Sequence, residues 1–121
     1  MSRALDDLSP VFRPFADRFL ARLMEAKIPV IIVTTSRTQA EQVDAVARGV
    51  SWTLNSKHLT GDAIDVCPYL IFDLHGPDKA QWDAQDPVWQ DIGRIGQACG
   101  LKWGVVNRQG TRKDLGHFQL A

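Results

Sequence analysis

The sequence predicts an α+β domain with a small, mostly antiparallel sheet and flanking helices. Apolar residues recur at steps of three and four in two segments, which is typical of amphipathic helices. Short β-branched or alternating runs lie between the helical segments and at the end of the chain, as in strands. The resulting order is helix, strand, helix, strand, helix, strand, strand, and this order favours the α+β class.

The first predicted helix covers residues 10–26 and presents one apolar face, formed by Val11, Phe12, Phe15, Phe19, Leu20 and Leu23. The run at 30–33 is β-branched throughout and predicts a buried strand. A second helix is expected over 39–48, because Ser36 or Thr38 can cap its first turn.

The middle of the chain alternates between loops and a short strand. Residues 50–62 are rich in Ser, Thr, Asn and Gly and predict a loop, whereas 63–66 alternate apolar and polar side chains as a strand does. Residues 73–86 carry Gly, Pro and many Asp and predict an exposed loop, in which His75 faces solvent.

The last part of the chain predicts a helix over 87–98, followed by strands at 101–106 and 117–120. A polar turn that contains Gly110 joins the two strands. Cys67 and Cys99 are expected to be small core residues, with a disulfide between them left open.

Size and charge limit the classes of function. The 121 residues suit one domain, 1–121, and we expect a monomer. Lys and Arg number 14, as do Asp and Glu, and this balance argues against a nucleic-acid partner. The longest apolar run is too short for a membrane span, and the N-terminus lacks the apolar core of a signal peptide.

Two polar segments carry residues that suit a metal site. His58 lies in the predicted loop and Asp65 on the strand after it, so both side chains could reach one point. Near the C-terminus, Asp114 precedes His117 by three residues, and Gly116 allows a turn that brings the two together.

Zinc in a hydrolase takes three protein ligands and leaves one position for water. His58, Asp65 and His117 can supply the ligands, and Asp114 can accept the proton of the metal-activated water. The spacing alone leaves open that these residues bind no metal, because a loop histidine is usually solvated and such spacings arise by chance.

Further motifs make the chain resemble the zinc-dependent M15 peptidases, part of the D-Ala-D-Ala carboxypeptidase-like superfamily. The resemblance covers about residues 30 to 120, and its most specific part is the pattern Ser-x-His-x-x-Gly-x-Ala-x-Asp. The matching segments are 56–65, Thr35 to Thr38 with Glu41-Gln42, Trp82-Asp83, Gly100 to Gly104, and Asp114 to His117. It implies a fold like those of Hedgehog and D,D-peptidase domains.

The resemblance also implies individual roles. The implied set is zinc ligands His58, Asp65 and His117, general base Asp114, carbonyl-binding Arg37, and substrate-binding Ser56 and Trp103. For Ser56 and Trp103 a structural role is equally open, because Ser56 could shape its loop and Trp103 could be buried beside its strand. For Arg37 the alternative is a cap of the following helix.

Within the family, the L-alanyl-D-glutamate endopeptidases of phage endolysins are the most similar branch, because the D-Ala-D-Ala branches usually carry Glu where Asp114 stands. The stretch from Val105 to Asn107 departs from the endolysin pattern. The resemblance implies a zinc-dependent hydrolase that cleaves the peptidoglycan stem peptide, at the L-Ala–D-Glu bond. It would be made in the host cytoplasm and act on the cell wall after membrane permeabilisation.

Two alternatives remain at this point. The first is a D-Ala-D-Ala carboxypeptidase, which uses the same chemistry but usually needs export. The second is a non-catalytic, zinc-stabilised binding domain, like the signalling domain of Hedgehog proteins. Arg37 and Asp114 argue against the second alternative, because a structural zinc site needs neither residue.

Overall fold

The computed structural model describes residues 1–49, 56–70, 79–106 and 108–121. Parts of the two predicted loops, residues 50–55 of the first and residues 73–78 with His75 of the second, lie outside the described residues. The α-helices are α1 (Arg13–Glu25), α2 (Gln39–Ala47) and α3 (Val88–Ala98), and two 3₁₀ helices are η1 (Leu5–Asp7) and η2 (Lys57–Thr60). The strands are β1 (Val30–Thr34), β2 (Ala63–Leu70), β3 (Lys79–Ala80), β4 (Leu101–Val106) and β5 (Arg112–Leu120).

The strands form one antiparallel arrangement in the order β1-β2-β5-β4, and the short β3 pairs with the end of β2. β2 and β5 are therefore the central neighbours, although 41 positions separate their nearest ends. This arrangement confirms the α+β class and the mostly antiparallel sheet.

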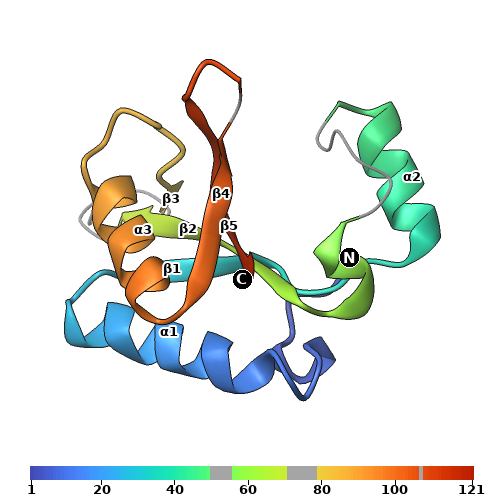
Figure 1. Ribbon diagram of the computed structural model, residues 1–121, viewed down its shortest axis with the longest axis horizontal. Helices are drawn as coiled ribbons and strands as arrows, with labels where there is room; N and C mark the ends of the chain where they lie inside the picture. Colours follow the sequence, from blue (N-terminus) through green and yellow to red (C-terminus); the bar gives the residue numbers. More distant parts are fainter. Residues whose placement is uncertain (50–55, 71–78, 107) are drawn as a thin grey trace.

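Helices α1 and α3 cover one face of the sheet, and α2 stands apart from both (Figure 1). The aromatic rings of Phe19 on α1 and Phe118 on β5 meet with centroids 4.4 Å apart. Burying a side chain of this size contributes on the order of 1.5–3 kcal/mol to folding. The core is completed mainly by Leu8, Phe12, Ala16, Leu23, Ile64, Val66, Ile92, Cys99, Leu101 and Trp103.

Strand alternation divides β2 and β5 between two faces. Ile64 and Val66 are fully buried in the core under the helices, as is Phe118. Side chains of adjacent strand residues point to opposite faces, so Asp65 and His117 lie on the face that α1 and α3 leave open. The core residues thus fix the direction of the polar pair.

The helix ends follow local rules. Thr38 and Glu41 form a reciprocal capping box at the start of α2, which confirms Thr38 as the cap. α1 begins at Arg13, later than predicted, because the Ser9 hydroxyl accepts the Phe12 N–H in a preceding turn. It ends at Glu25, and Lys27 takes a left-handed backbone with φ of 60°.

Four features differ from the sequence prediction. The segment 57–60 is a 3₁₀ helix inside the predicted loop, and 79–80 form a strand inside another. β2 continues past Pro68, because the ring removes only a donor and the Pro68 carbonyl still accepts from the Gln81 N–H at 2.8 Å. β5 begins at Arg112 instead of His117, because its pairing with β4 resumes beyond a bulge.

Both cysteines are free thiols in the interior. Burial raises the pKa of the Cys67 thiol to about 11, so this sulfur stays protonated at neutral pH and is a poor nucleophile. Among the described residues, every helix is too short or too polar to cross a bilayer.

Candidate metal centre

Three elements bring the predicted ligands together. Asp65 on β2 and His117 on β5 are direct cross-strand partners, so both side chains leave the same face of the sheet. His58 comes from η2, whose first turn is capped by the Ser56 hydroxyl through the His58 N–H. Gly61 ends η2 with a φ of 73°, and this turn returns the chain directly to β2.

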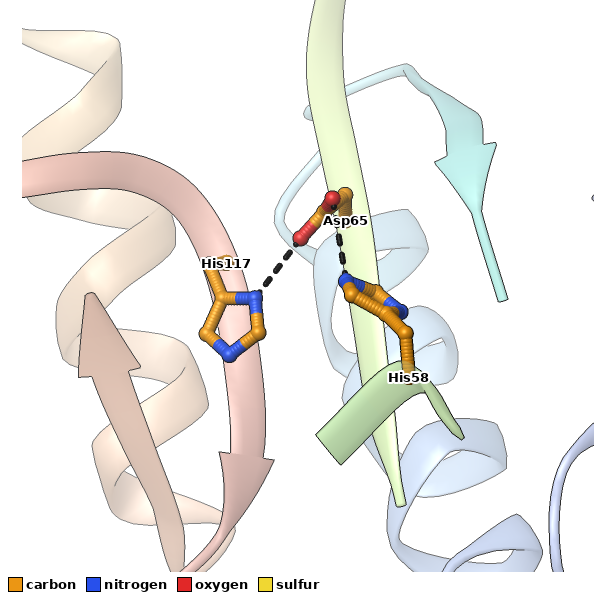
Figure 2. A group of neighbouring side chains, drawn as sticks. All are labelled: His58, Asp65 and His117. Carbon is orange, nitrogen blue, oxygen red and sulfur yellow. Dashed lines mark hydrogen bonds and ion pairs between the residues drawn. The ribbon is translucent and has the colours of Figure 1, made fainter. Parts of the chain in front are cut away.

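The Asp65 carboxylate lies between the two imidazoles, with one oxygen toward each ring (Figure 2). Its Oδ1 is 2.9 Å from Nδ1 of His117, and its Oδ2 is 3.1 Å from Nε2 of His58. One ligand atom from each residue lies within 4.8 Å of the others. Ligand atoms around a tetrahedral zinc ion lie roughly 3.3 Å apart, so the cluster is close to that spacing.

The hydrogen bonds of His58 fix which ring nitrogen carries its hydrogen. Nδ1 lies 3.0 Å from the Thr35 carbonyl, which can only accept, so Nδ1 is the donor. In the neutral ring, the lone pair of Nε2 then faces the Asp65 carboxylate. Nε2 has no hydrogen-bond partner among the described residues. Two electron-rich atoms at this distance repel each other unless a proton or a metal ion lies between them. Two imidazole nitrogens and a carboxylate are a donor set that fits zinc.

Electrostatics keep the carboxylate ready to bind a cation. Burial by itself would raise the pKa of Asp65, but the hydrogen bond with His117 and the nearby His58 outweigh burial and hold the pKa well below its usual range. Burial opposes a charge on His117, yet Asp65, through its hydrogen bond and its charge, together with Gln119 and the charge of Asp114, raises the pKa of the imidazole. The Asp65 carboxyl group is thus ionised at neutral pH.

Gln119 is a site residue that the sequence prediction missed. Its Oε1 lies 2.9 Å from Nε2 of His117, the ring nitrogen that faces away from Asp65. Residues two apart on a strand share a face, so the sequence spacing of His117 and Gln119 could have predicted their contact. A donor bond from Nε2 leaves Nδ1 free to hold a metal ion.

A bulge in β5 places Asp114 beside the triad. Trp103 pairs with Phe118 and Val105 with Lys113, so four residues of β5 face one residue of β4. Asp114 and Gly104 both have φ of 58°. The predicted turn at Gly116 is wrong, because the irregular backbone lies at Asp114. Gly116 is needed for another reason: a Cβ at this position would lie 2.3 Å from the Val66 carbonyl oxygen.

Asp114 is exposed on the cleft side but partly desolvated by its surroundings. Desolvation raises the pKa of its carboxyl group, and the neighbouring Asp65 charge raises it further. The charges of His117, His58 and Arg37 partly offset this rise. An acid group with these neighbours and a raised pKa is suited to accept and return a proton.

Arg37 lies at the edge of the triad, where its Nη2 is 4.0 Å from Oδ2 of Asp65. Nη1 donates to the buried Gln42 at 3.1 Å, and the backbone N–H donates to the His58 carbonyl at 3.1 Å. These bonds fix the guanidinium beside the metal ligands. Arg37 is therefore not the cap of α2, because Thr38 has that role.

The two predicted substrate-binding residues have structural contacts. Ser56 caps η2, and its contact with substrate stays a prediction. Trp103 is 5% exposed, and its indole N–H donates to the Leu115 carbonyl at 2.7 Å. The Arg112 guanidinium covers its ring at 4.3 Å. Trp103 therefore supports the cleft through Arg112, not by lining it.

A cleft of about 650 Å³ opens beside the centre. Asp65 and Asp114 line one part of it, and Trp82 and Trp89 form an aromatic part with ring centroids 6.3 Å apart. Residues 111–116 of the β4–β5 hairpin form the remaining wall. A ligand in this cleft would thus contact both the carboxylate of the triad and the raised-pKa acid.

Known proteins of similar sequence and fold are L-alanyl-D-glutamate peptidases. The sequence matches the model of the phage L-alanyl-D-glutamate peptidase family over residues 2–118. It is 32% identical over 83 residues to the L-alanyl-D-glutamate peptidase of Escherichia phage T5, a match that covers 66% of this chain and 56% of that protein. The matched region thus spans little more than half the length of that relative.

The structure is similar to the crystal structure of the Serratia marcescens L-Ala D-Glu endopeptidase ChiX. The TM-score is 0.68 at 27% sequence identity, and the match covers 97% of this chain and 83% of ChiX. The similarity extends over nearly all of the present chain, so the sheet, the helices and the candidate centre all fall within the shared fold.

Proposed function

The chain belongs to the phage L-alanyl-D-glutamate peptidase family, and we propose on that premise that it hydrolyses the L-Ala–D-Glu bond of the peptidoglycan stem peptide as a zinc enzyme. The observation that carries the proposal is the grouping of His58, Asp65 and His117 next to Asp114 on the wall of one cleft. A structural zinc site needs neither an adjacent base nor access from a cleft.

In this proposal, His58 and His117 act as neutral nitrogen ligands and Asp65 as the anionic ligand. Zinc held there supplies a Lewis acid that polarises the scissile carbonyl and acidifies the attacking water. The Thr35 carbonyl and Gln119 hold the two imidazoles in the required tautomers.

Asp114 accepts the proton from the attacking water and passes it to the departing glutamate nitrogen. The pKa of Asp114 is raised toward neutral pH, which favours both the uptake of the proton and its return to the leaving nitrogen. Arg37, held by Gln42, faces the negative charge that develops on the carbonyl oxygen. A pre-positioned cation is effective because it needs no reorganisation during the reaction.

The bond can be identified by digesting a defined stem pentapeptide and weighing the products. Cleavage at L-Ala–D-Glu should release alanine from a shortened peptide that has glutamate at its new amino terminus. The exposed Asp17→Asn variant should cut as wild type does, because Asp17 lies on α1. Release of the terminal D-Ala alone would contradict the proposal and favour a carboxypeptidase.

A further inference from the structure

The cleft wall carries positive charge that the proposed catalytic steps do not use. Arg112 and Lys113 line the cleft, as do the carboxylates of Asp65 and Asp114. They precede Asp114 directly in β5, so both cations belong to the wall that holds the proposed base. The described lining therefore divides into an acidic part at the metal centre and a basic part beside it.

The two cations differ in their contacts. Arg112 is fixed, because its guanidinium stacks on Trp103 at 4.3 Å and donates to the Trp103 carbonyl. Lys113 is exposed and forms no ion pair with any residue in the described ranges. Its ammonium group therefore remains available to a ligand of opposite charge.

The bulge explains why consecutive residues share one wall. On a regular strand, Lys113 and Asp114 would point to opposite faces of the sheet. The positive φ of Asp114 breaks this alternation, and the residues from 111 to 116 all line the cleft. The same backbone irregularity that places the base therefore places a lysine next to it.

The proposed substrate has a carboxylate at the corresponding place. Glutamate on the amine side of the scissile bond has two carboxyl groups, and the continuing peptide uses only one of them. The second stays free, a few bonds from the nitrogen that departs. The Asp114 carboxylate would repel this group, so a cation nearby in the cleft favours its binding.

We infer that Lys113, with Arg112 fixed beside it, forms a subsite for the free carboxylate of the glutamate residue on the amine side of the scissile bond. This inference rests on the proposed function. Lys113 is thereby a specificity-determining residue that distinguishes an acidic substrate from one whose carboxylate is amidated. A charge-assisted contact of this kind changes kcat/KM by on the order of tenfold.

The test compares two stem peptides that differ only in a free carboxylate or a carboxamide at this glutamate. Wild type should cleave the acid about tenfold faster in kcat/KM than the amide. Lys113→Gln should lose that advantage by slowing on the acid alone, and Lys113→Arg should retain it. Lys27→Gln, an exposed lysine after α1, should behave as wild type does.

Four outcomes would overturn the inference. An unchanged acid preference in Lys113→Gln would show that another group reads the carboxylate. A preference that instead follows amidation of the peptide's C-terminus would place the recognised carboxylate there. If wild type leaves the L-Ala–D-Glu bond of both peptides intact, the proposed function fails as well. If wild type cleaves both peptides at equal rates, the inference fails while the proposed function stands.

Discussion

Asp114 combines a left-handed backbone with a raised pKa, and both follow from its place in the β5 bulge. Aspartate tolerates this backbone better than most residues do, which helps to explain why the bulge can form here. The carboxyl group is next to the triad without belonging to it. A residue in this position can act on a proton while the metal ligands stay unchanged.

The Asp114→Asn variant tests that separation. An amide cannot accept a proton at neutral pH, so kcat should fall on the order of 10²–10⁴-fold. Zinc content and thermal stability should stay near the wild-type values, because Asn has the same shape. Elemental analysis alongside stem-peptide cleavage measures both quantities. Wild-type activity in this variant would show that Asp114 is not the base. Loss of zinc would show that Asp114 helps to hold the metal instead.

Gln119 should affect the metal without contacting it. Gln119→Leu removes the acceptor at Nε2 of His117, so the ring loses the bond that fixes its tautomer and orientation. We expect zinc affinity to fall about 10–100-fold. Competition with a chelating dye measures the affinity, and Gln119→Glu, which keeps an acceptor, should recover most of it. Equal affinities in wild type and Gln119→Leu would contradict this role.

At the scale of elements, a hydrogen-bonded turn ties the N-terminal segment to the loop that carries His58. The Asp62 carboxylate accepts from the Ser9 and Thr60 hydroxyls, and the Ser9 N–H donates to the Gly61 carbonyl at 2.9 Å. Gly61 is required there, because a Cβ would lie 2.9 Å from the Asp7 carbonyl. This turn therefore holds η2 in position for the metal centre.

The turn predicts a dependence of stability on pH. The hydrogen bonds from Ser9 and Thr60 lower the pKa of Asp62 in the folded protein. Its contribution is therefore complete above the unfolded value near pH 4 and is lost as pH falls through the folded pKa. Urea unfolding from pH 7 to 3 should show a shallower acid decline in Asp62→Asn than in wild type.

The matched control is Asp44→Asn, an exposed carboxyl on α2. It should keep the wild-type acid decline, because its ion pair with Arg48 is solvent-exposed and contributes little to stability. Parallel pH profiles for wild type and Asp62→Asn would show that the Asp62 carboxylate contributes nothing specific to the folded state.

The sequence predicted the class of fold and the members of the metal triad for identifiable reasons. Asp65 lies between buried Ile64 and Val66, so alternation alone directs it away from the core. His117 and Phe118 divide between the two faces in the same way. The 56–65 pattern then joins His58 to Asp65 through a glycine turn.

Other features depend on pairings that local patterns do not encode. The bulge at Asp114 appears only when β5 is aligned with β4, and this alignment depends on both strands at once. The start of β5 at Arg112 and the short β3 have the same origin. The substrate contact of Trp103, which the family resemblance implies, stays a prediction, whereas the bond of its indole N–H to the Leu115 carbonyl appears only in the folded hairpin.

At the scale of the whole molecule, the helices leave one face of the sheet free, and the metal centre lies on that face beside the cleft. In the proposed zinc enzyme, folding and metal binding are coupled, because the triad joins η2, β2 and β5. In the proposed enzyme, one zinc ion is therefore required both to complete the site and to make the cleft active.

Zinc titration of the metal-stripped protein tests this requirement most directly, with cleavage of the stem peptide and bound zinc measured on the same samples. Release of the peptide with a new glutamate amino terminus should rise in proportion to zinc and stop rising at one ion per chain. His58→Ala and His117→Ala should neither retain zinc nor cleave at those concentrations. Full cleavage by the stripped protein, or wild-type zinc content in both variants, would show that zinc at this site is not what makes the protein active.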